Sequence, residues 1–492
     1  MNIYSWLDIH GKERPSKVCM RTHNLEITYG ELSRTTRSLG SALKKAGIKR
    51  EDKVILVLPN IPEFVISYMA VVGLGATAVT VNPSYTAWEL DYIIRNSESK
   101  AIILERRRLE TYREILDQCD LDLVITTGEE GDFTQWVTGS PREINEDLGA
   151  DDVAVMMYSS GLTGYPMGVM LTQGNLEHNS DAMRLCMGCD ETDTTLTVIP
   201  LFHSFSASVN MLSMLRLGGT LYLMSRLNFK EIDYALSRGG VTVIGAVPTL
   251  FFGLIHHPEV QGVDCSGVRT LIAGGSALSI EIFEAFKEKF HQEIRQGYGI
   301  TEASPVCSVN RKQRPIKPET IGQTIHQVEV RVVDESGRTL KPMETGELLF
   351  KGPNIMKGYY RYEKETEEII RDGWLYTGDL GFVDEEGYIT ITGYKKEMII
   401  TSGFNVYSRE VEGVLNAMPG VKDSAITGVP DLMRGAIIKA YIVAENKHGP
   451  SGPDIKHLAH QYLAPFKTPR LIEFVEEIPR NSAGKVLFSQ LP

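Results

Sequence analysis

A stretch rich in hydroxyl groups and glycine has the composition of a phosphate-binding loop: Tyr158-Ser-Ser-Gly-Leu-Thr-Gly-Tyr-Pro-Met-Gly-Val169. Glycine has no Cβ, so backbone N–H groups can turn inward there and approach an anion closely. The hydroxyls of Ser159, Ser160 and Thr163 add side-chain donors for phosphate oxygens. The stretch lacks the Gly-Lys-Ser/Thr ending of a Walker loop and the Gly-x-Gly-x-x-Gly spacing of a dinucleotide-binding turn. An ordinary Ser/Gly turn between two strands would explain the same composition.

A second segment combines an aromatic ring, a hydroxyl and a carboxylate: Gln296-Gly-Tyr-Gly-Ile-Thr-Glu302. The aromatic face suits a nucleotide base, and the threonine hydroxyl suits a phosphate. The carboxylate suits a hard cation such as Mg²⁺. These residue types are compatible with a site for a nucleotide and its metal ion.

Two shorter segments extend this chemistry. Ala273-Gly-Gly-Ser276 lies between a predicted strand and a predicted helix, where it could contact a base. Trp374-Leu-Tyr-Thr-Gly-Asp-Leu-Gly381 carries Asp379, whose carboxylate could accept hydrogen bonds from both hydroxyls of a ribose. Either segment alone could also be a simple turn.

Together, and in this order along the chain, these motifs resemble those of the adenylate-forming enzymes, the superfamily of acyl-CoA synthetases, luciferases and peptide-synthetase adenylation domains. The resemblance extends over nearly the whole chain. It implies an AMP-forming acid:CoA ligase, which activates a carboxylic acid with ATP and Mg²⁺ to an acyl-adenylate and then transfers the acyl group to coenzyme A.

The resemblance also implies roles for individual residues. Tyr298 would stack on adenine, Thr301 would bond a phosphate, and Glu302 would face Mg²⁺. Asp379 would hold the ribose, and His203 would lie beside the acyl group and the phosphates, although a lone histidine among apolar residues is more often part of a core. The other residues of the implied nucleotide site are Ser159, Ser160, Gly161, Leu162, Thr163, Gly164, Met167, Gly274, Gly275, Ser276, Gln296, Gly297, Gly299 and Tyr394.

Further motifs near the C-terminus match the same superfamily. Lys396 occupies the position about which a C-terminal lobe would rotate between the two half-reactions. Ser402 and Gly403 would then line the tunnel for the pantetheine arm of CoA. Lys485, otherwise a surface charge in a turn, would bridge the substrate carboxylate and the α-phosphate, a use that suits a compact and mobile ammonium group.

Two positions depart from the superfamily's pattern, and they keep alternatives open. Met167 stands where lysine is usual, and Tyr394 stands where an arginine usually helps to bind the ribose. A nucleotide- or acyl-binding protein with impaired turnover is therefore one alternative, and an adenylating enzyme with an acceptor other than CoA is another. An amino-acid adenylation domain is the nearest enzymatic alternative, but such domains usually place an aspartate after an aromatic residue near this stretch, and Phe202-His203-Ser204 contains none.

The acid itself is indicated only by apolar segments. Residues 209–215 and 248–252 suit a pocket for a fatty or a carbocyclic or aromatic acid, although the same residues would also suit a core.

Composition excludes some other classes. The chain has 492 residues, 42% of them hydrophobic, and a formal net charge of −12. This charge argues against nucleic acid or an anionic membrane as the main partner, while peripheral membrane contact and the oligomeric state stay open.

No basic start followed by an apolar core stands at the N-terminus, so we expect a cytoplasmic protein whose six cysteines are reduced. The uncharged run 64–81 is divided by Gly73 and Gly75, which favours a buried helix and strand over a membrane span.

Between the motifs, strand-like and helix-like patterns alternate, which predicts crossover units and mainly parallel sheets. The predicted strands are 53–58, 76–81, 100–104, 123–127, 196–200, 219–224, 241–247 and 269–273. Helices are predicted from Pro62 onward, over 88–96 and over 111–118. Around Val328 the pattern becomes that of antiparallel strands, at 328–333 and 346–350.

The predicted fold class is therefore α/β, with two mainly parallel sheets and an antiparallel β subdomain in a large N-terminal lobe and a small mobile α+β C-terminal lobe. We expect an N-terminal adenylate-forming domain over 1–393 and a mobile C-terminal domain over 394–492, with a hinge near Lys396.

Overall fold

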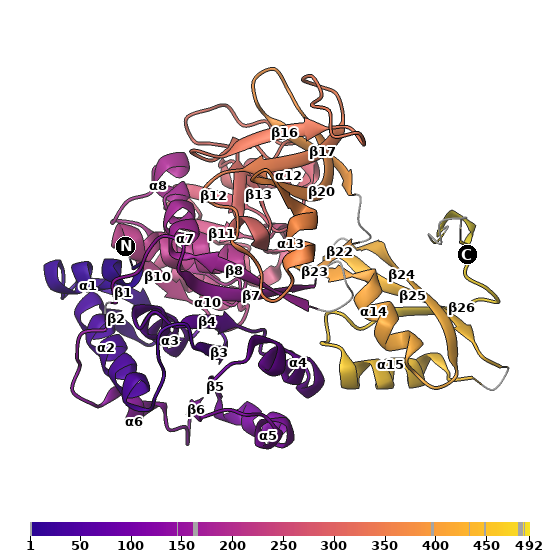
Figure 1. Cartoon of the computed structure of the whole chain (residues 1–492). Coiled ribbons are helices and arrows are strands. Elements are labelled where there is room, and N and C mark those ends of the chain that lie inside the picture. Colours follow the sequence, from indigo (N-terminus) through magenta and orange to yellow (C-terminus); the bar gives the residue numbers. More distant parts are fainter. Residues whose placement is uncertain are drawn as a thin grey trace. The chain divides into compact units, whose positions relative to one another are not determined.

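The computed structural model describes residues 2–144, 146–160, 166–394, 398–431, 433–446, 449–480, 486 and 488–492. The chain divides into two compact units (Figure 1). The larger unit comprises Met1–Pro83, Ile94–Tyr158 and Gly168–Gly393. The smaller unit comprises Ser84–Ile93, Ser159–Met167 and Tyr394–Pro492, so two short segments from the N-terminal half belong to it.

The first sheet of the larger unit has seven strands, in the order β18-β8-β7-β4-β3-β5-β6. Their bounds are β18 (Gly358–Tyr359), β8 (Pro166–Thr172), β7 (Val153–Ser160), β4 (Thr77–Thr80), β3 (Lys53–Val57), β5 (Ala101–Glu105) and β6 (Leu123–Thr127). From β7 through β6 the strands pair in parallel. Parallel strands need crossovers, and these are α3 (Pro62–Gly73), α4 (Ala87–Ser97), the 3₁₀ turn η1 (Arg106–Arg108) and α5 (Leu109–Gln118).

Helix α3 and strand β4 account for the uncharged run that could be mistaken for a membrane span. Pro62 starts α3, where its missing N–H costs nothing, and every residue from Phe64 to Gly73 is buried. All residues of β4 are buried as well. Among the helices of the described residues, none is long and apolar enough to cross a bilayer.

The second sheet has nine strands, in the order β15-β14-β13-β12-β11-β9-β10-β1-β2. Their bounds are β15 (Gln323–Thr324), β14 (Val306–Val309), β13 (Arg295–Gly299), β12 (Thr270–Ala273), β11 (Val243–Ala246), β9 (Thr194–Thr197), β10 (Thr220–Leu223), β1 (Val18–Arg21) and β2 (Glu26–Thr28). The strands from β13 to β1 pair in parallel, and antiparallel strands close both ends.

The remaining helical segments of the larger unit connect or flank these strands. They are α1 (Tyr4–Glu13), α2 (Tyr29–Lys45), α6 (Phe133–Val137), α7 (Gln173–Ser180), α8 (Ala182–Met187), the π-helix η2 (Ser206–Leu212), α9 (Ser213–Leu217), α10 (Phe229–Ser237), α11 (Pro248–His256), the 3₁₀ turn η3 (Pro258–Val260), α12 (Ile280–Phe290), the 3₁₀ turn η4 (Thr301–Ala303) and α13 (Glu363–Ile369). Several begin at side-chain caps. In α2, for example, Thr28 and Glu31 form a reciprocal capping box.

A third sheet of the larger unit has five strands. They are β16 (Glu329–Val333), β17 (Gly346–Lys351), β19 (Ile370–Arg371), β20 (Trp374–Val383) and β21 (Ile389–Tyr394). The pairs of β16 with β17, β17 with β20 and β19 with β20 are antiparallel. This sheet is the antiparallel subdomain that the alternating sequence pattern predicted.

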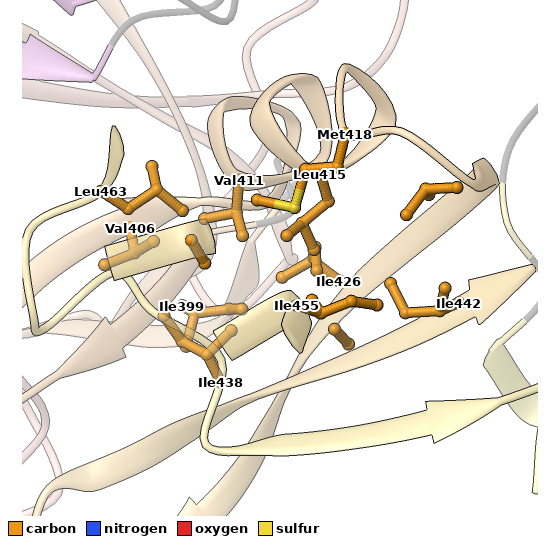
Figure 2. Packing of buried hydrophobic residues seen from close by; sticks show 13 residues of the cluster. Ile399, Val406, Val411, Leu415, Met418, Ile426, Ile438, Ile442, Ile455 and Leu463 are labelled. Atoms are coloured by element: carbon orange, nitrogen blue, oxygen red, sulfur yellow. The ribbon is translucent and has the colours of Figure 1, made fainter. Parts of the chain in front are cut away.

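The smaller unit has its own core. Its main sheet consists of β24 (Val421–Asp431), β25 (Gly435–Ala444) and β26 (Leu471–Phe474), and it also contains the hairpin of β22 (Met398–Thr401) and β23 (Phe404–Tyr407), the helices α14 (Ser408–Asn416) and α15 (Gly452–Tyr462), and the short η5 (Phe488–Gln490). Figure 1 shows β24, β25 and β26 side by side, as their pairing requires. Apolar side chains of α14, α15 and the strands form one buried cluster, with Val411, Leu415, Ile426, Ile438 and Ile455 among its members (Figure 2).

The predicted fold class is confirmed: mixed α/β, with a large N-terminal part built on two mainly parallel sheets and a small α+β C-terminal part. Strand boundaries differ by a few residues from those predicted. The largest difference is at β9, predicted at 196–200 but observed at Thr194–Thr197. The side chain of Asn60 bonds the carbonyls of Thr197 and Ile199, which turns the chain out of the sheet there.

Candidate active site

The carboxyl ends of β12 and β13 carry two of the predicted nucleotide-binding segments. Because these strands pair in parallel, Gly274 and Gly275 after β12 and Thr301 after β13 start from the same edge of the sheet. Gly275 has a φ of +81°, which a side chain would strain. A Cβ on Gly274 would lie 3.2 Å from Cζ of Phe205, so glycine allows the segment that carries His203 to approach this edge. Ser276 follows, half-buried.

The segment around His203 is fixed by a buried asparagine. Asn60 Nδ2 donates to the carbonyl of Ile199 (2.9 Å), and the Leu201 N–H donates to Asn60 Oδ1 (2.7 Å). The Thr80 hydroxyl donates to the carbonyl of Phe202 (3.0 Å). His203 Nδ1 accepts from the N–H of Phe205 (3.2 Å), which places the ring proton on Nε2. This segment is therefore tied to the first sheet through residues that follow β3 and end β4.

Burial lowers the pKa of His203 to about 4 from its ordinary value of 6.5. The imidazole is therefore neutral at neutral pH. It can offer an Nε2–H to an oxygen, but it contributes no positive charge to a phosphate.

Thr301 meets the His203 segment directly. Its Oγ1 lies 3.3 Å from Oγ of Ser204, and either hydroxyl can donate. The structure thus brings Thr301 and the His203 segment together. Sequence reasoning missed Ser204 as a partner because one hydroxyl beside a histidine has no distinctive spacing.

The carboxylate of Glu302 is held from the edge of the first sheet. Its Oε1 accepts from the hydroxyl of Tyr359 (2.9 Å), and its backbone carbonyl accepts from the N–H of Met356 (2.9 Å). Tyr359 lies on β18, opposite Val169 on the strand that follows the phosphate loop. A half-buried carboxylate of this kind is a hard oxygen ligand that fits Mg²⁺.

Tyr298 and Asp379 contact each other. The Tyr298 hydroxyl donates to Oδ2 of Asp379, and the Tyr298 ring stacks against Phe350 with centroids 5.7 Å apart. Burial and the Asp379 carboxylate raise the pKa of Tyr298 well above its ordinary value, so it keeps its proton. Asp379 is 7% exposed, and its N–H donates to Thr377 Oγ1 (3.0 Å). The two side chains assigned to the base and the ribose thus lie in one cluster.

The glycines and glutamine of the Gln296–Glu302 motif have packing roles. Gln296 is buried, and its Oε1 accepts from the N–H of Leu278 (3.3 Å), so it braces the segment after Ser276. A Cβ on Gly299 would overlap the carbonyl oxygen of Pro305, and one on Gly297 would lie 3.2 Å from the carbonyl oxygen of Ser308. These glycines let β13 lie close to β14.

Part of the predicted site lies outside the described residues. This holds for Gly161, Leu162, Thr163, Gly164, Lys396 and Lys485, and for the side chains of Ser160 and Tyr394. Ser159 and Met167, at the two ends of the phosphate loop, are described, and Met167 is fully buried.

Ser402 and Gly403 form the two-residue turn of the β22–β23 hairpin in the smaller unit. Their φ angles are +52° and +83°, the combination that a type I′ turn requires and that glycine adopts without strain. The Ser402 N–H donates to the carbonyl of Arg434 (2.7 Å), the residue before β25, which fixes the turn there. Thus Gly403 has a conformational reason to be glycine that does not depend on a ligand.

Comparison with known proteins defines the class. Residues 7–360 match the family model described as AMP-binding enzyme, and residues 410–485 match that of the AMP-binding enzyme C-terminal domain. The chain belongs to this family of AMP-binding enzymes and so to the adenylate-forming superfamily, as its motifs predicted.

Two related sequences and one solved structure show which enzymes of this family the chain is similar to. The feruloyl-CoA synthase of an Amycolatopsis species is 32% identical over 484 residues, which cover 98% of this chain and 97% of the relative. The long-chain-fatty-acid–CoA ligase of Bacillus subtilis (strain 168) is 30% identical over 512 residues, covering 97% and 91%. The solved structure of o-succinylbenzoate CoA synthetase from Bacillus subtilis, bound with a product analogue, superposes with a TM-score of 0.90 at 27% identity, covering 99% of this chain and 97% of that one. The prediction of an AMP-forming acyl-CoA synthetase is confirmed.

Proposed function

We propose that this enzyme activates an apolar carboxylic acid, fatty or aromatic, with ATP and Mg²⁺ and passes the acyl group to CoA. The observation that carries the proposal is the convergence at the carboxyl edge of β12 and β13. There the Tyr298–Asp379 cluster provides an aromatic ring and a carboxylate for a nucleoside, and Thr301 contacts the segment of His203.

In the first half-reaction an oxygen of the substrate carboxylate attacks the α-phosphorus of ATP, and the bond to pyrophosphate breaks. Both reactants are anions, so the protein contributes mainly by positioning them and neutralising charge. We assign the neutralisation to Lys485 and to the amides of the phosphate loop, and we assign a hydrogen bond to a phosphate oxygen to Thr301. Since His203 is neutral, we assign to it a hydrogen bond from Nε2 to a reactant oxygen rather than a positive charge.

Glu302 is the residue that would hold Mg²⁺, which supplies positive charge to the phosphate oxygens when it is bound. The hydrogen bond from Tyr359 orients the carboxylate before the ion arrives. A ligand that is oriented in advance loses less entropy on binding.

In the second half-reaction the thiol sulfur of CoA attacks the carbonyl carbon of the acyl-adenylate, and the carbon–oxygen bond to AMP breaks. We propose that the C-terminal domain, residues 394–492, rotates about Lys396 between the two steps. This motion withdraws Lys485 and brings the Ser402–Gly403 turn toward the pantetheine arm. The hairpin that carries this turn is suited to such a role, because a two-residue turn with positive φ angles matches the twist of its two strands.

The preference for an apolar acid is supported by the segments proposed for the acyl pocket. Residues 209–215 lie in η2 and α9 and are all buried. A π-helical stretch such as η2 is rare and is often found at functional sites. Helix α11 adds the half-buried Phe252.

We propose a cytoplasmic location. All six cysteines are free thiols in the structure, which fits a reducing compartment.

A panel of acids of graded length and aromaticity, supplied with ATP, Mg²⁺ and CoA, tests the proposal. Formation of AMP and pyrophosphate with matching loss of CoA thiol is the expected result for at least one acid. Formation of acyl-adenylate without loss of CoA thiol, followed by acyl transfer to an added amine, would instead indicate an acceptor other than CoA. Nucleotide binding by calorimetry without any AMP formation would indicate a binding protein with impaired turnover.

A further inference from the structure

Strand β20 is interrupted by a bulge at the point where it carries Asp379. Two pairs of its ladder with β17 enclose the bulge: Glu347 with Leu380, and Leu349 with Tyr376. Residues 377–379 of β20 therefore lie opposite a single residue of β17, Leu348. A bulge leaves backbone groups without ladder partners and can turn a side chain in a new direction, and bulges are frequent next to active sites.

The carboxylate of Glu347 supplies a partner for one of these backbone groups. Gly378, in the middle of the bulge, has a φ of +77°, and its N–H donates to Glu347 Oε1 (3.0 Å). A buried N–H without a partner would be costly, and a buried carboxylate needs donors as well. Because both groups are buried, this hydrogen bond fixes the direction in which the chain turns at Gly378.

The hydroxyl of Thr377 fixes the bulge from its other end. It donates to the carbonyl of Leu348 (2.7 Å), the residue opposite the bulge, and it accepts from the N–H of Asp379 (3.0 Å). One hydroxyl thus ties the bulge to β17 and holds the backbone of Asp379 itself. Thr377 and Glu347 are 8% and 9% exposed, so water has little access to replace these bonds.

The carboxylate that the bulge presents belongs to the nucleoside cluster. Asp379 Oδ2 accepts from the hydroxyl of Tyr298 on β13. A displacement of residues 377–379 would move this carboxylate directly, because it is attached to the bulge. The Tyr298 ring would stay in place, because it lies on another strand and stacks on Phe350. The bulge therefore controls the group assigned to the ribose separately from the ring assigned to the base.

We propose that Glu347 and Thr377 are positioning residues that aim Asp379 at the ribose hydroxyls of the nucleotide. Neither side chain is assigned to a ligand, and each acts through the backbone of the bulge. The inference rests on the proposed function only in assigning Asp379 to the ribose. Loss of either side chain weakens recognition of the ribose hydroxyls and leaves recognition of the base intact.

Four substitutions in two matched pairs test this proposal. Glu347→Leu removes the acceptor for the Gly378 N–H, whereas Glu347→Gln keeps an oxygen there. Thr377→Val removes the hydroxyl and keeps the branched shape, whereas Thr377→Ser keeps the hydroxyl. Since the pairs act on different ends of the bulge, either pair decides the question if a variant of the other does not fold. Glu329→Leu, which replaces an exposed glutamate on β16 of the same sheet, is the control.

Calorimetric titrations with AMP and with 2′,3′-dideoxy-AMP, which lacks both ribose hydroxyls, provide the comparison. We expect the wild type to bind AMP about tenfold or more tightly than the dideoxy nucleotide. In Glu347→Leu and Thr377→Val we expect Kd for AMP to rise about fivefold, within the range of about 2- to 30-fold that is usual for residues acting through others. Kd for the dideoxy nucleotide stays unchanged in both. Glu347→Gln, Thr377→Ser and Glu329→Leu keep the wild-type preference for AMP.

A role limited to stability gives a different pattern. The melting temperature of Glu347→Leu and Thr377→Val falls, but their preference for AMP over the dideoxy nucleotide equals that of the wild type, and this result would overturn the proposal. Equal weakening of AMP binding by Glu347→Gln and Glu347→Leu would also overturn it, because glutamine retains the acceptor.

A double-mutant cycle adds a further criterion. If Glu347 acts through Asp379, the double variant Glu347→Leu/Asp379→Ala binds AMP as weakly as Asp379→Ala alone. Additive losses of affinity contradict this path.

Turnover of acids separates this inference from the proposed function. If no acid is turned over but Glu347→Leu and Thr377→Val lose their preference for AMP, the proposed function fails and the inference stands. If acids are turned over and both variants keep that preference, the inference fails alone. Equal binding of the two nucleotides by the wild type would remove Asp379 from the ribose and overturn the inference with it.

Discussion

The contact between Tyr298 and Asp379 leads to a prediction that separates binding from stability. Asp379→Ala removes the carboxylate that we assign to the ribose and also removes the hydrogen bond from the half-buried Tyr298 hydroxyl to Asp379. A hydrogen bond to a charged group contributes about 1.5–3 kcal/mol. Loss of one such bond to the ribose therefore raises Kd for AMP by about 10- to 150-fold. The lost hydrogen bond from the Tyr298 hydroxyl costs about 0.5–1.5 kcal/mol of folding free energy in addition.

Tyr298→Phe serves as the matched control. It removes the hydroxyl but keeps the ring that stacks on Phe350, so we expect AMP binding to change little. The double variant Tyr298→Phe/Asp379→Ala leaves neither partner unpaired, so it recovers stability without recovering AMP affinity. Calorimetric titration of AMP and thermal unfolding of the three variants provide both measurements.

Two results would refute this reasoning. An unchanged Kd for AMP in a folded Asp379→Ala protein removes Asp379 from the nucleotide site. Recovery of AMP affinity in the double variant would mean that Asp379 acts only by holding Tyr298, and the ribose assignment would then be wrong.

Three further predictions concern Lys485, Met167 and His203, the residues assigned to the phosphates and the acyl group. Lys485→Ala abolishes acyl-adenylate formation but spares thioester formation from a pre-made acyl-adenylate, and equal loss in both assays contradicts a mechanism with two arrangements of the C-terminal domain. Met167→Lys lowers KM for ATP with little change for AMP or CoA. Because Met167 is fully buried, the same variant melts at a lower temperature without ATP, and an unchanged KM would show that this position does not face the phosphates. His203 has a folded pKa of about 4 against 6.5 when unfolded, so the unfolded chain binds the extra proton first and stability falls as the pH drops from about 6.5 toward 4. Denaturant unfolding of His203→Asn is expected to have a shallower pH dependence over this range, and an identical slope would contradict the burial of the ring.

Much of the fold was predictable because its signals are local. Alternation of strands and helices gave the parallel sheets, and the break at Gly73 and Gly75 separated α3 from β4. Strand β18 was not predicted, since two residues, Gly358–Tyr359, are too few for any periodicity. It exists because it pairs with β8, which is far away in the sequence.

Sequence motifs named the candidate site residues, but they did not reveal which other residues hold these side chains in place. Thr301 and Asp379 stand in recognisable motifs, whereas Asn60, which fixes the His203 segment, is an ordinary asparagine in a loop. The ion pair of Lys467 with Glu89 joins residues 378 positions apart. No local sequence pattern around Lys467 or Glu89 predicts this ion pair, because only the folded structure brings the two residues together.

The cysteine thiols of this protein could in principle be acylated by its own reaction intermediate. An acyl-adenylate reacts readily with nucleophiles, and a cysteine thiolate near it would capture the acyl group in competition with CoA. Five of the six cysteines are buried, and burial raises the pKa of Cys189 and Cys265 to about 12. Burial, with the nearby carboxylates of Asp379 and Glu302, also raises the pKa of Cys307 far above its ordinary value. A protonated thiol is a poor nucleophile, so these three buried thiols are poorly suited to compete with CoA for an acyl group.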